Sequence, residues 1–157
     1  MGVSIEQNFN SDAIKKILTK DSLWDAIAED GQDKDEFEVD LNKNYFLSVN
    51  VGETCIGLYI LHAFNGATMQ IHANILPEYR KHAKESGKKV LEWFQDNASD
   101  KFEKIIALIP VIYPKVYHFT KNRGFTDEGL ITKAYRKNGR LIDIHILGLE
   151  RYTLKRE

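Results

Sequence analysis

The sequence of 157 residues has a single cysteine, three prolines and no long hydrophobic run. Because one cysteine cannot pair within the chain and no apolar secretory leader opens it, we expect no disulfide and a cytoplasmic location. The longest uncharged apolar stretch, residues 105–114, has about half the length that crossing a bilayer requires. We therefore expect a soluble protein without membrane association.

A large charge of one sign is also missing, since the formal net charge is -1 and the pI is about 6.5. No overall basic field is present of the kind that holds nucleic acid, so no nucleic-acid partner is expected. The charge is nevertheless divided along the chain. Residues 29–40 hold seven acidic residues and one lysine, whereas residues 79–140 hold 14 Lys and Arg and 7 Asp and Glu. Both segments are interpretable as solvated surface, or as sites for a cationic ligand and a phosphorylated ligand.

Motifs for metals and nucleotides are absent as well. The five histidines are scattered without the spacing of metal ligands, and one cysteine cannot build a structural zinc site. Neither a P-loop nor a Gly-x-Gly-x-x-Gly pattern occurs. No metal is therefore expected.

What is present indicates one globular domain over residues 1–157. Hydrophobic residues make up 43% of the chain and aromatic residues 11%, which is enough to form a core. This length is typical of a single domain, and no internal repeat or linker divides it.

Hydrophobic periodicity predicts a mixed α/β fold. In the first half, alternation predicts a strand at residues 3–7, and helical spacing predicts short helices at 13–18 and 23–28. Three β-rich runs at 45–51, 54–64 and 68–76 are joined by turn residues, Gly52-Glu53 and Asn65-Gly66, and predict an antiparallel meander.

In the second half, the pattern predicts a long helix at residues 83–98 and a buried strand at 104–111. A short helix at 114–122 follows, and two strands at 125–136 and 141–149 flank Asn138-Gly139. The expected order is β-α-α-β-β-β-α-β-α-β-β.

This order resembles that of the GNAT superfamily of acetyl-CoA-dependent N-acetyltransferases over almost the whole chain. Ile75 to Arg80, followed by Gly87 to Phe94, is similar to the strand–loop–helix motif on which that family binds coenzyme A. Gly124-Phe125 opens the sixth strand as in the family. The resemblance implies a mostly antiparallel sheet of about seven strands, flanked by about four helices.

Further residues resemble one branch of that superfamily. Residues 121–129, with Asn138-Gly139-Arg140 and Asp143, are similar to the members that acetylate protein N-termini and small amines. Compact proteins of this kind are also encoded by bacteriophages, and the Ile109-Pro110 step is similar to theirs.

The start of the helix at 83–98 is the expected cofactor site, because unpaired N–H groups and the helix dipole there favour a pyrophosphate. The family loop reads Gln or Arg, two residues, Gly, one residue, and Gly or Ala. Either possible alignment is incomplete, and both place Glu85 where a small residue usually stands, so that its carboxylate would repel a phosphate. The alternative is a capped helix with surface lysines. The expected cofactor-binding residues are Asn74, Ile75, Leu76, Arg80, Lys81, His82, Ala83, Lys84, Glu85, Ser86, Gly87 and Lys88.

The candidate general base is His72. Alternation places it on one face of a strand with Gln70 and Asn74, and an ordinary histidine has a pKa near neutrality. A half-exposed or core histidine is the alternative interpretation. Backbone near residues 74–76 is expected to polarise the thioester carbonyl.

The candidate general acid is less clearly marked. Many members carry a Tyr four residues before the Gly of Gly-Phe, and Thr120 occupies that position here. Because a threonine hydroxyl is too weak an acid, the candidates are Tyr117, His118 or a water molecule.

The resemblance implies an enzyme that transfers acetyl from acetyl-CoA to a primary amine, either a peptide N-terminus or a polyamine-like molecule. The acidic segment at residues 29–40 would favour a cationic acceptor. Two alternatives stay open, motivated by Glu85 and Thr120: a non-catalytic GNAT-like protein, such as a phage structural, assembly or binding protein, and an acyl-CoA sensor. A protein partner and a homodimer are further possible associations.

Overall fold

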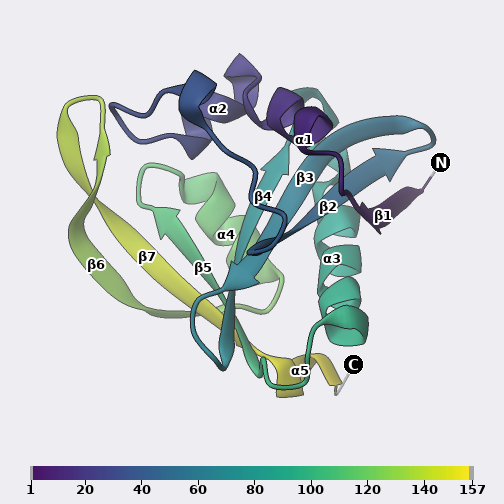
Figure 1. Ribbon diagram of the computed structural model, residues 1–157. Coiled ribbons are helices and arrows are strands. Elements are labelled where there is room, and N and C mark those ends of the chain that lie inside the picture. The colour runs from purple at the N-terminus through teal and green to yellow at the C-terminus, as the bar shows by residue number, and fades with distance from the viewer. Residues whose placement is uncertain (1, 156–157) are drawn as a thin grey trace.

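A computed structural model describes residues 2–155 and shows one seven-stranded sheet in the order β1-β2-β3-β4-β5-β7-β6 (Figure 1). The first half contains β1 (Val3–Gln7), α1 (Ser11–Leu18), α2 (Asp21–Ile27), β2 (Asn44–Val51), β3 (Thr54–Ala63) and β4 (Thr68–Ile75). The second half contains α3 (Ala83–Asn97), β5 (Lys104–Pro110), α4 (Pro114–Asn122), β6 (Thr126–Lys137), β7 (Arg140–Glu150) and α5 (Arg151–Lys155). Short 3-10 helices lie at η1 (Lys34–Glu36) and η2 (Pro77–His82).

The element order expected from the sequence is confirmed up to β7. All neighbouring strands pair antiparallel except β4 and β5, which are parallel. The three additions are α5, η1 and η2, which contain three to six residues each. Elements this short show no measurable hydrophobic period, so the pattern did not predict them.

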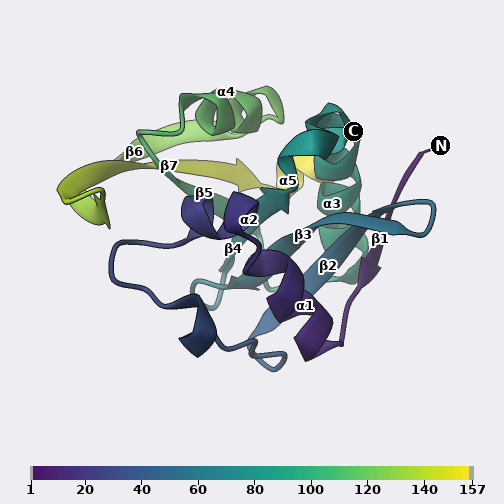
Figure 2. The same ribbon diagram turned by 90° about the horizontal axis from the view of Figure 1, so that it is seen from above.

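The helices form two layers on opposite faces of the sheet (Figure 2). The α1–α2 pair covers β2 to β4 on one face, where Ile14 and Leu18 pack against Phe46 and Leu58. On the other face α3 and α4 cover the main core, in which Val90 and Phe94 are fully buried. We call these two sides the α1–α2 face and the α3–α4 face.

The C-terminal end of α3 is held by Arg151, the first residue of α5. Its side chain is almost fully buried, and its guanidinium stacks on Phe94 at 4.7 Å. The N–H groups donate to backbone carbonyls at and just beyond this helix end, where intrahelical donors run out. These acceptors are the carbonyls of Phe94, Gln95, Ala98, Ser99 and Phe102.

Candidate functional site

The two parallel strands at the centre of the sheet separate soon after they meet. β4 and β5 pair at Thr68–Lys104, Met69–Ile105 and Gln70–Ile106. β4 then continues to Ile75 and β5 to Pro110 without further pairing between them. Figure 1 shows the two arrowheads diverging below α2. We call this opening the β4–β5 cleft.

Backbone alternation determines which groups of β4 face the cleft. The Leu76 N–H donates to Ile56 O, and the Phe64 N–H donates to Thr68 O, so the even-numbered residues of β4 pair with β3. In an antiparallel ladder the alternate residues point their N–H and C=O the other way. The backbone groups of Ile71, Ala73 and Ile75 therefore face the β4–β5 cleft.

This finding corrects part of the cofactor expectation. The N–H groups of Asn74 and Leu76 point to β3 and are unavailable for polarising a bound carbonyl, which leaves Ile75 from the expected backbone segment. Ala73 joins it as a candidate donor. Periodicity alone did not reveal this, because it assigns side chains to faces but does not say which edge of a strand is already paired.

The opposite wall of the cleft is formed by β5. The Val111 N–H donates to Asp143 O, so the odd-numbered residues pair with β7 and the even-numbered residues face β4. Pro110 is one of these and has no N–H, and its carbonyl accepts from the Tyr113 N–H. Proline is tolerated here because its missing donor would have no ladder partner.

On the α3–α4 face, α3 and α4 pack against each other at Gly87. A Cβ atom on Gly87 would lie 3.4 Å from Phe119 and 3.5 Å from Arg123, so glycine allows α4 to approach. Tyr59 and Ser86 are buried there, with their hydroxyl oxygens 3.4 Å apart. Burial raises the pKa of Tyr59. Within residues 2–155, the buried Arg123 Nε has no hydrogen-bond partner.

The start of α3 carries the expected basic residues on its surface. η2 runs directly into α3, and the Ala83 N–H donates to Arg80 O, so a 3-10 helix replaces the expected open loop. Arg80, Lys81, Lys84 and Lys88 are exposed. This arrangement concentrates positive charge at the start of α3.

Glu85 points away from these basic residues. Its carboxylate accepts the Val3 N–H at 3.2 Å and lies 3.6 Å from the Lys89 ammonium, which donates to Val3 O. Glu85 thus fastens α3 to β1. The structure therefore gives no reason to expect this carboxylate to repel a bound phosphate.

Two histidines lie together on the α1–α2 face. His72 on β4 and His62 on β3 stack with ring centroids 5.2 Å apart, and their Nε2 atoms are 3.1 Å apart. Burial, and to a lesser degree the nearby His62, lowers the pKa of His72 to about 4. The expectation of a near-neutral pKa is therefore wrong, because loss of solvent disfavours the charged ring.

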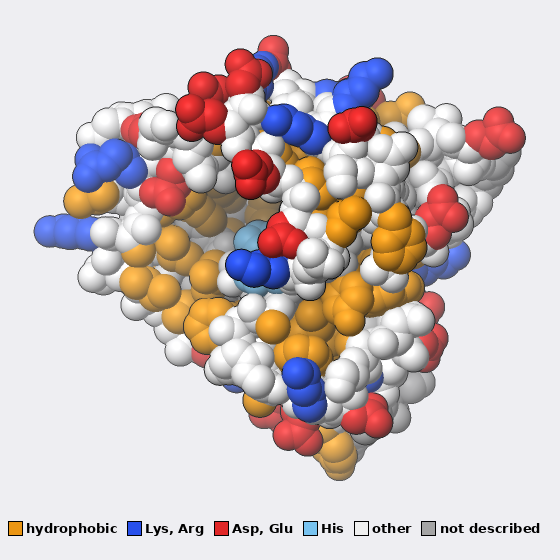
Figure 3. Space-filling view, in the orientation of Figure 1, with side chains coloured by type: hydrophobic (Ala, Val, Ile, Leu, Met, Phe, Trp, Pro, Cys, Tyr) orange, Lys and Arg blue, Asp and Glu red, His pale blue; other side chains and the backbone are white. Residues whose placement is uncertain are grey.

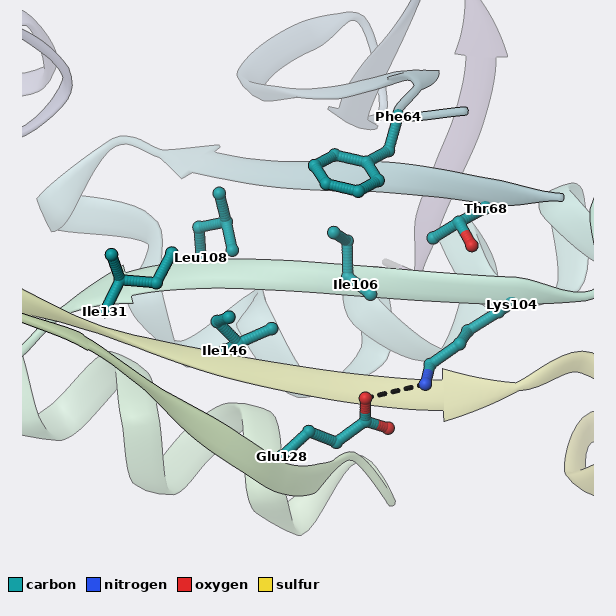
Figure 4. A pocket seen from close by; sticks show the side chains of 8 residues that line it. All are labelled: Phe64, Thr68, Lys104, Ile106, Leu108, Glu128, Ile131 and Ile146. Atoms are coloured by element: carbon teal, nitrogen blue, oxygen red, sulfur yellow. Dashed lines mark hydrogen bonds and ion pairs between the residues drawn. The ribbon is translucent and has the colours of Figure 1, made fainter. Parts of the chain in front are cut away.

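The face around this histidine pair is hollowed and partly apolar. Figure 3 shows histidine at the floor of a hollow, with acidic side chains above it and apolar side chains beside it. A groove of about 280 Å³ runs along β5 on the same face. Figure 4 shows Ile106, Leu108 and Ile146 lining it, with the Lys104–Glu128 ion pair at one end.

The first two residues of the acidic segment form hydrogen bonds with the β6–β7 hairpin. Asp30 accepts the N–H groups of Asn138 and Gly139, and Glu29 accepts the Arg136 N–H. These backbone bonds lower the pKa of Asp30. The Lys137 ammonium donates to the carbonyls at the end of α2. These contacts place the start of the acidic segment against the hairpin.

Two tyrosines lie beside this junction. Burial raises the pKa of Tyr113, and it raises that of Tyr135 to about 12. The carboxylate of Asp25 contributes to both shifts, and Glu29 contributes to that of Tyr135. The Asp25 side chain is 91% exposed, and its carboxylate lies 3.8 Å from the buried Lys137 ammonium, so this cluster already holds a cation of the chain.

The candidate acids on α4 lie apart from His72. The Tyr117 hydroxyl donates to Asp127 at 2.6 Å, and its ring packs on His145 of β7, on the α3–α4 face. His118 is exposed, and the Thr120 hydroxyl donates to Val116 O within its own helix. The structure therefore brings none of the three to the histidine pair.

Comparison with known proteins identifies a family. A family model described as "Protein of unknown function (DUF2824)" matches residues 7–157. The chain belongs to this family. No curated protein sequence matches the chain.

Solved structures share its fold. The spermidine N-acetyltransferase of Vibrio cholerae in complex with CoA and spermine has a TM-score of 0.79 at 20% identity, with 96% of each chain covered. A chimera of that enzyme with hSSAT has a TM-score of 0.79 at 17% identity over 100% of both chains. Mutant forms of the spermidine/spermine N-acetyltransferase from the same bacterium have a TM-score of 0.78 at 18% identity, covering 98% of this chain and 97% of theirs. This member of the DUF2824 family therefore has the GNAT fold.

The residues present fit coenzyme A. The cleft offers unpaired backbone groups, Arg123 Nε is buried without a hydrogen-bond partner among residues 2–155, and lysines surround the start of α3. In contrast, no group of three or more His, Cys, Asp or Glu side chains in residues 2–155 is arranged to hold a metal ion. Over the same residues, no helix is long and apolar enough to span a membrane.

Proposed function

We propose that this protein transfers the acetyl group of acetyl-CoA to a primary amine. The observation that carries the proposal is the β4–β5 cleft, where two parallel strands separate and leave backbone donors and acceptors on both edges. An extended ligand with amide groups can pair with such edges as an added strand does. The pantetheine arm of coenzyme A has this chemistry.

The basic residues support a place for the phosphates. Lys84 and Lys88 are exposed on α3. A groove between α3, α4 and α5 is lined by Lys88 and Arg123, together with the carboxylates of Glu92 and Asp96. Positive charge at these positions attracts a diphosphate, and Glu85 is held elsewhere.

The steps of the acetyl transfer are assigned to a few groups of the protein. Bound acetyl-CoA supplies an activated acetyl group, whose carbonyl carbon bonds to the amine nitrogen as its bond to sulfur breaks. The N–H of Ala73 or Ile75 donates to the carbonyl oxygen and stabilises the charge that develops there. His72 is neutral at neutral pH and takes the proton of the amine as the C–N bond forms, when that proton becomes more acidic, because a base of pKa about 4 is too weak to deprotonate a free ammonium. The Tyr117 hydroxyl is bonded to Asp127 and that of Thr120 to Val116 O, so we assign protonation of the departing thiolate to solvent.

The acceptor amine can be a polyamine or a peptide N-terminus, and a different feature favours each. Asp25 and Glu29 beside Tyr113 and Tyr135 favour a polycation. The apolar groove along β5 favours a peptide with hydrophobic side chains after its first amine. Both ligands would reach the histidine pair from the hollow.

The test is a thiol-release assay with acetyl-CoA and two acceptors, spermidine and a short peptide with an apolar sequence, followed by mass spectrometry of the acceptor. We expect acetylation of at least one of them and a fall of roughly a hundredfold or more in kcat for His72→Ala, with acetyl-CoA affinity nearly intact. Binding of acetyl-CoA without turnover of any amine would favour the acyl-CoA sensor. Absence of binding at millimolar acetyl-CoA would favour the non-catalytic GNAT-like protein, the alternative that Thr120 at the position of the family's tyrosine motivates.

A further inference from the structure

We propose that His62 is a positioning residue for His72: it accepts the Nε2–H of His72 and thereby leaves the Nδ1 lone pair of His72 free to take the proton of the amine. The catalytic part of this inference rests on the proposed acetyl transfer. The assignment of the two tautomers does not, and it is testable without turnover.

The hydrogen-bond chain determines where the protons are. Nδ1 of His62 lies 3.3 Å from the carbonyl oxygen of Ala63, and a carbonyl can only accept, so this nitrogen carries the hydrogen. A neutral His62 then has its lone pair on Nε2, which lies 3.1 Å from Nε2 of His72. Nε2 of His72 must therefore donate, and its Nδ1 is unprotonated.

The opposite assignment of the two tautomers creates a repulsive contact and places the hydrogen of His72 on Nδ1. If His62 donated from Nε2, a neutral His62 would turn the lone pair of Nδ1 toward the lone pairs of Ala63 O, which is repulsive. His72 would then carry its hydrogen on Nδ1 and could not accept a proton there. The orientation that we propose removes this conflict and keeps His72 competent as a base.

Because His72 is partly buried, its hydrogen bond to His62 matters for its protonation. Among residues 2–155, His62 is the one titratable group that contributes to the pKa shift of His72, the rest of which comes from burial. When His72 takes a proton, its charged ring is poorly solvated, and the bond from Nε2–H to His62 becomes charge-assisted. Ile60, Gln70 and Asn74 share this face of the hairpin, and Phe37 and Val39 pack on the same apolar cluster as Ile60, whereas Figure 3 shows acidic and basic side chains over the histidine.

The sheet register fixes the pair rigidly. His62 lies opposite Gln70 and His72 lies opposite Ile60, so the two histidines are diagonal neighbours on one face of the β3–β4 hairpin. The stacked rings are tilted by 17° from parallel. Both residues are thus held by regular strand backbone, which favours a fixed orientation over a mobile one.

The first test is nitrogen-15 NMR of the full chain labelled at histidine, at about neutral pH. A protonated ring nitrogen and an unprotonated one have clearly different shifts, so each tautomer can be read directly. We expect His62 to be protonated at Nδ1 and His72 at Nε2. A hydrogen on Nδ1 of His72 would overturn the inference.

The second test measures the role in turnover with two replacements. His62→Phe keeps an aromatic ring but removes the acceptor, and we expect kcat to fall by about 10- to 100-fold with little change in KM. His62→Gln restores an acceptor oxygen and should recover most of kcat. Equal losses in both variants would show that restoring an acceptor does not restore turnover, which would refute the positioning role.

The two tests separate failure of the inference from failure of the proposed function. A wild-type protein without turnover on any amine would remove the catalytic role of both histidines, whatever their tautomers. An active wild-type protein with unaffected His62→Phe kinetics would keep the proposed function and reject the role of His62.

Discussion

The unusual protonation of His72 makes the stability of the fold depend on pH. In the unfolded chain a histidine takes up a proton near pH 6.5, whereas the folded protein resists protonation of His72 until about pH 4. Between these values the unfolded state binds more protons, so the free energy of unfolding falls as the pH is lowered through this window. From about pH 7 to about pH 5, this linkage removes about 1 to 2 kcal/mol, allowing for solvent screening of a partly exposed ring.

The assay is urea unfolding at both pH values for the wild type and His72→Gln, which cannot titrate. We expect the wild type to lose about 1 to 2 kcal/mol more than the variant between the two conditions. His118→Gln is the matched control, because it removes an exposed histidine and leaves the His62–His72 pair in place. If the wild type and His72→Gln lost the same free energy, the lowered pKa of His72 would be refuted.

Three further predictions concern other parts of the molecule. Arg151→Met should lower the free energy of unfolding by about 3 kcal/mol, because five backbone carbonyls lose a charged donor; an unchanged urea midpoint would contradict this. Gly57→Ala should cost about 1 to 3 kcal/mol in the same assay, since its Cβ would lie 2.4 Å from Asn74 O, whereas Gly66→Ala, in open space, should cost much less. Lys84→Glu should weaken acetyl-CoA binding by about 3- to 10-fold in calorimetry, while Lys16→Glu on α1 should not; equal affinities would remove the proposed phosphate site from α3.

Local patterns predicted most of the fold because its elements are long and regular. The apolar stripe of α3 and the Asn65-Gly66 turn between β3 and β4 carry strong periodic and turn signals. α5 was missed because it has five residues and its first residue, Arg151, forms its bonds with the distant end of α3. Such a contact has no local signature in the sequence.

The site was only partly predictable for the same reason. His72 was placed on the correct strand face, but its partner His62 was not identified, although the β3–β4 hairpin register would have revealed the diagonal pair. The direction of Glu85 depends on β1, which lies about 80 residues earlier in the chain and packs against α3 only in the folded state. The open edges of β4 and β5 follow from where the two strands separate, and hydrophobic periodicity does not encode that point.

The most direct test of the central claim is an amide NMR titration of the protein with acetyl-CoA. The proposed function requires that the ligand pair with the open edge of β4, so the amide resonances of Ile71, Ala73 and Ile75 should shift and gain protection from exchange. The amides of β1, at the far edge of the sheet, should change little. Binding that left these three resonances unmoved, or no binding at millimolar acetyl-CoA, would contradict the assignment of the β4–β5 cleft as the cofactor site.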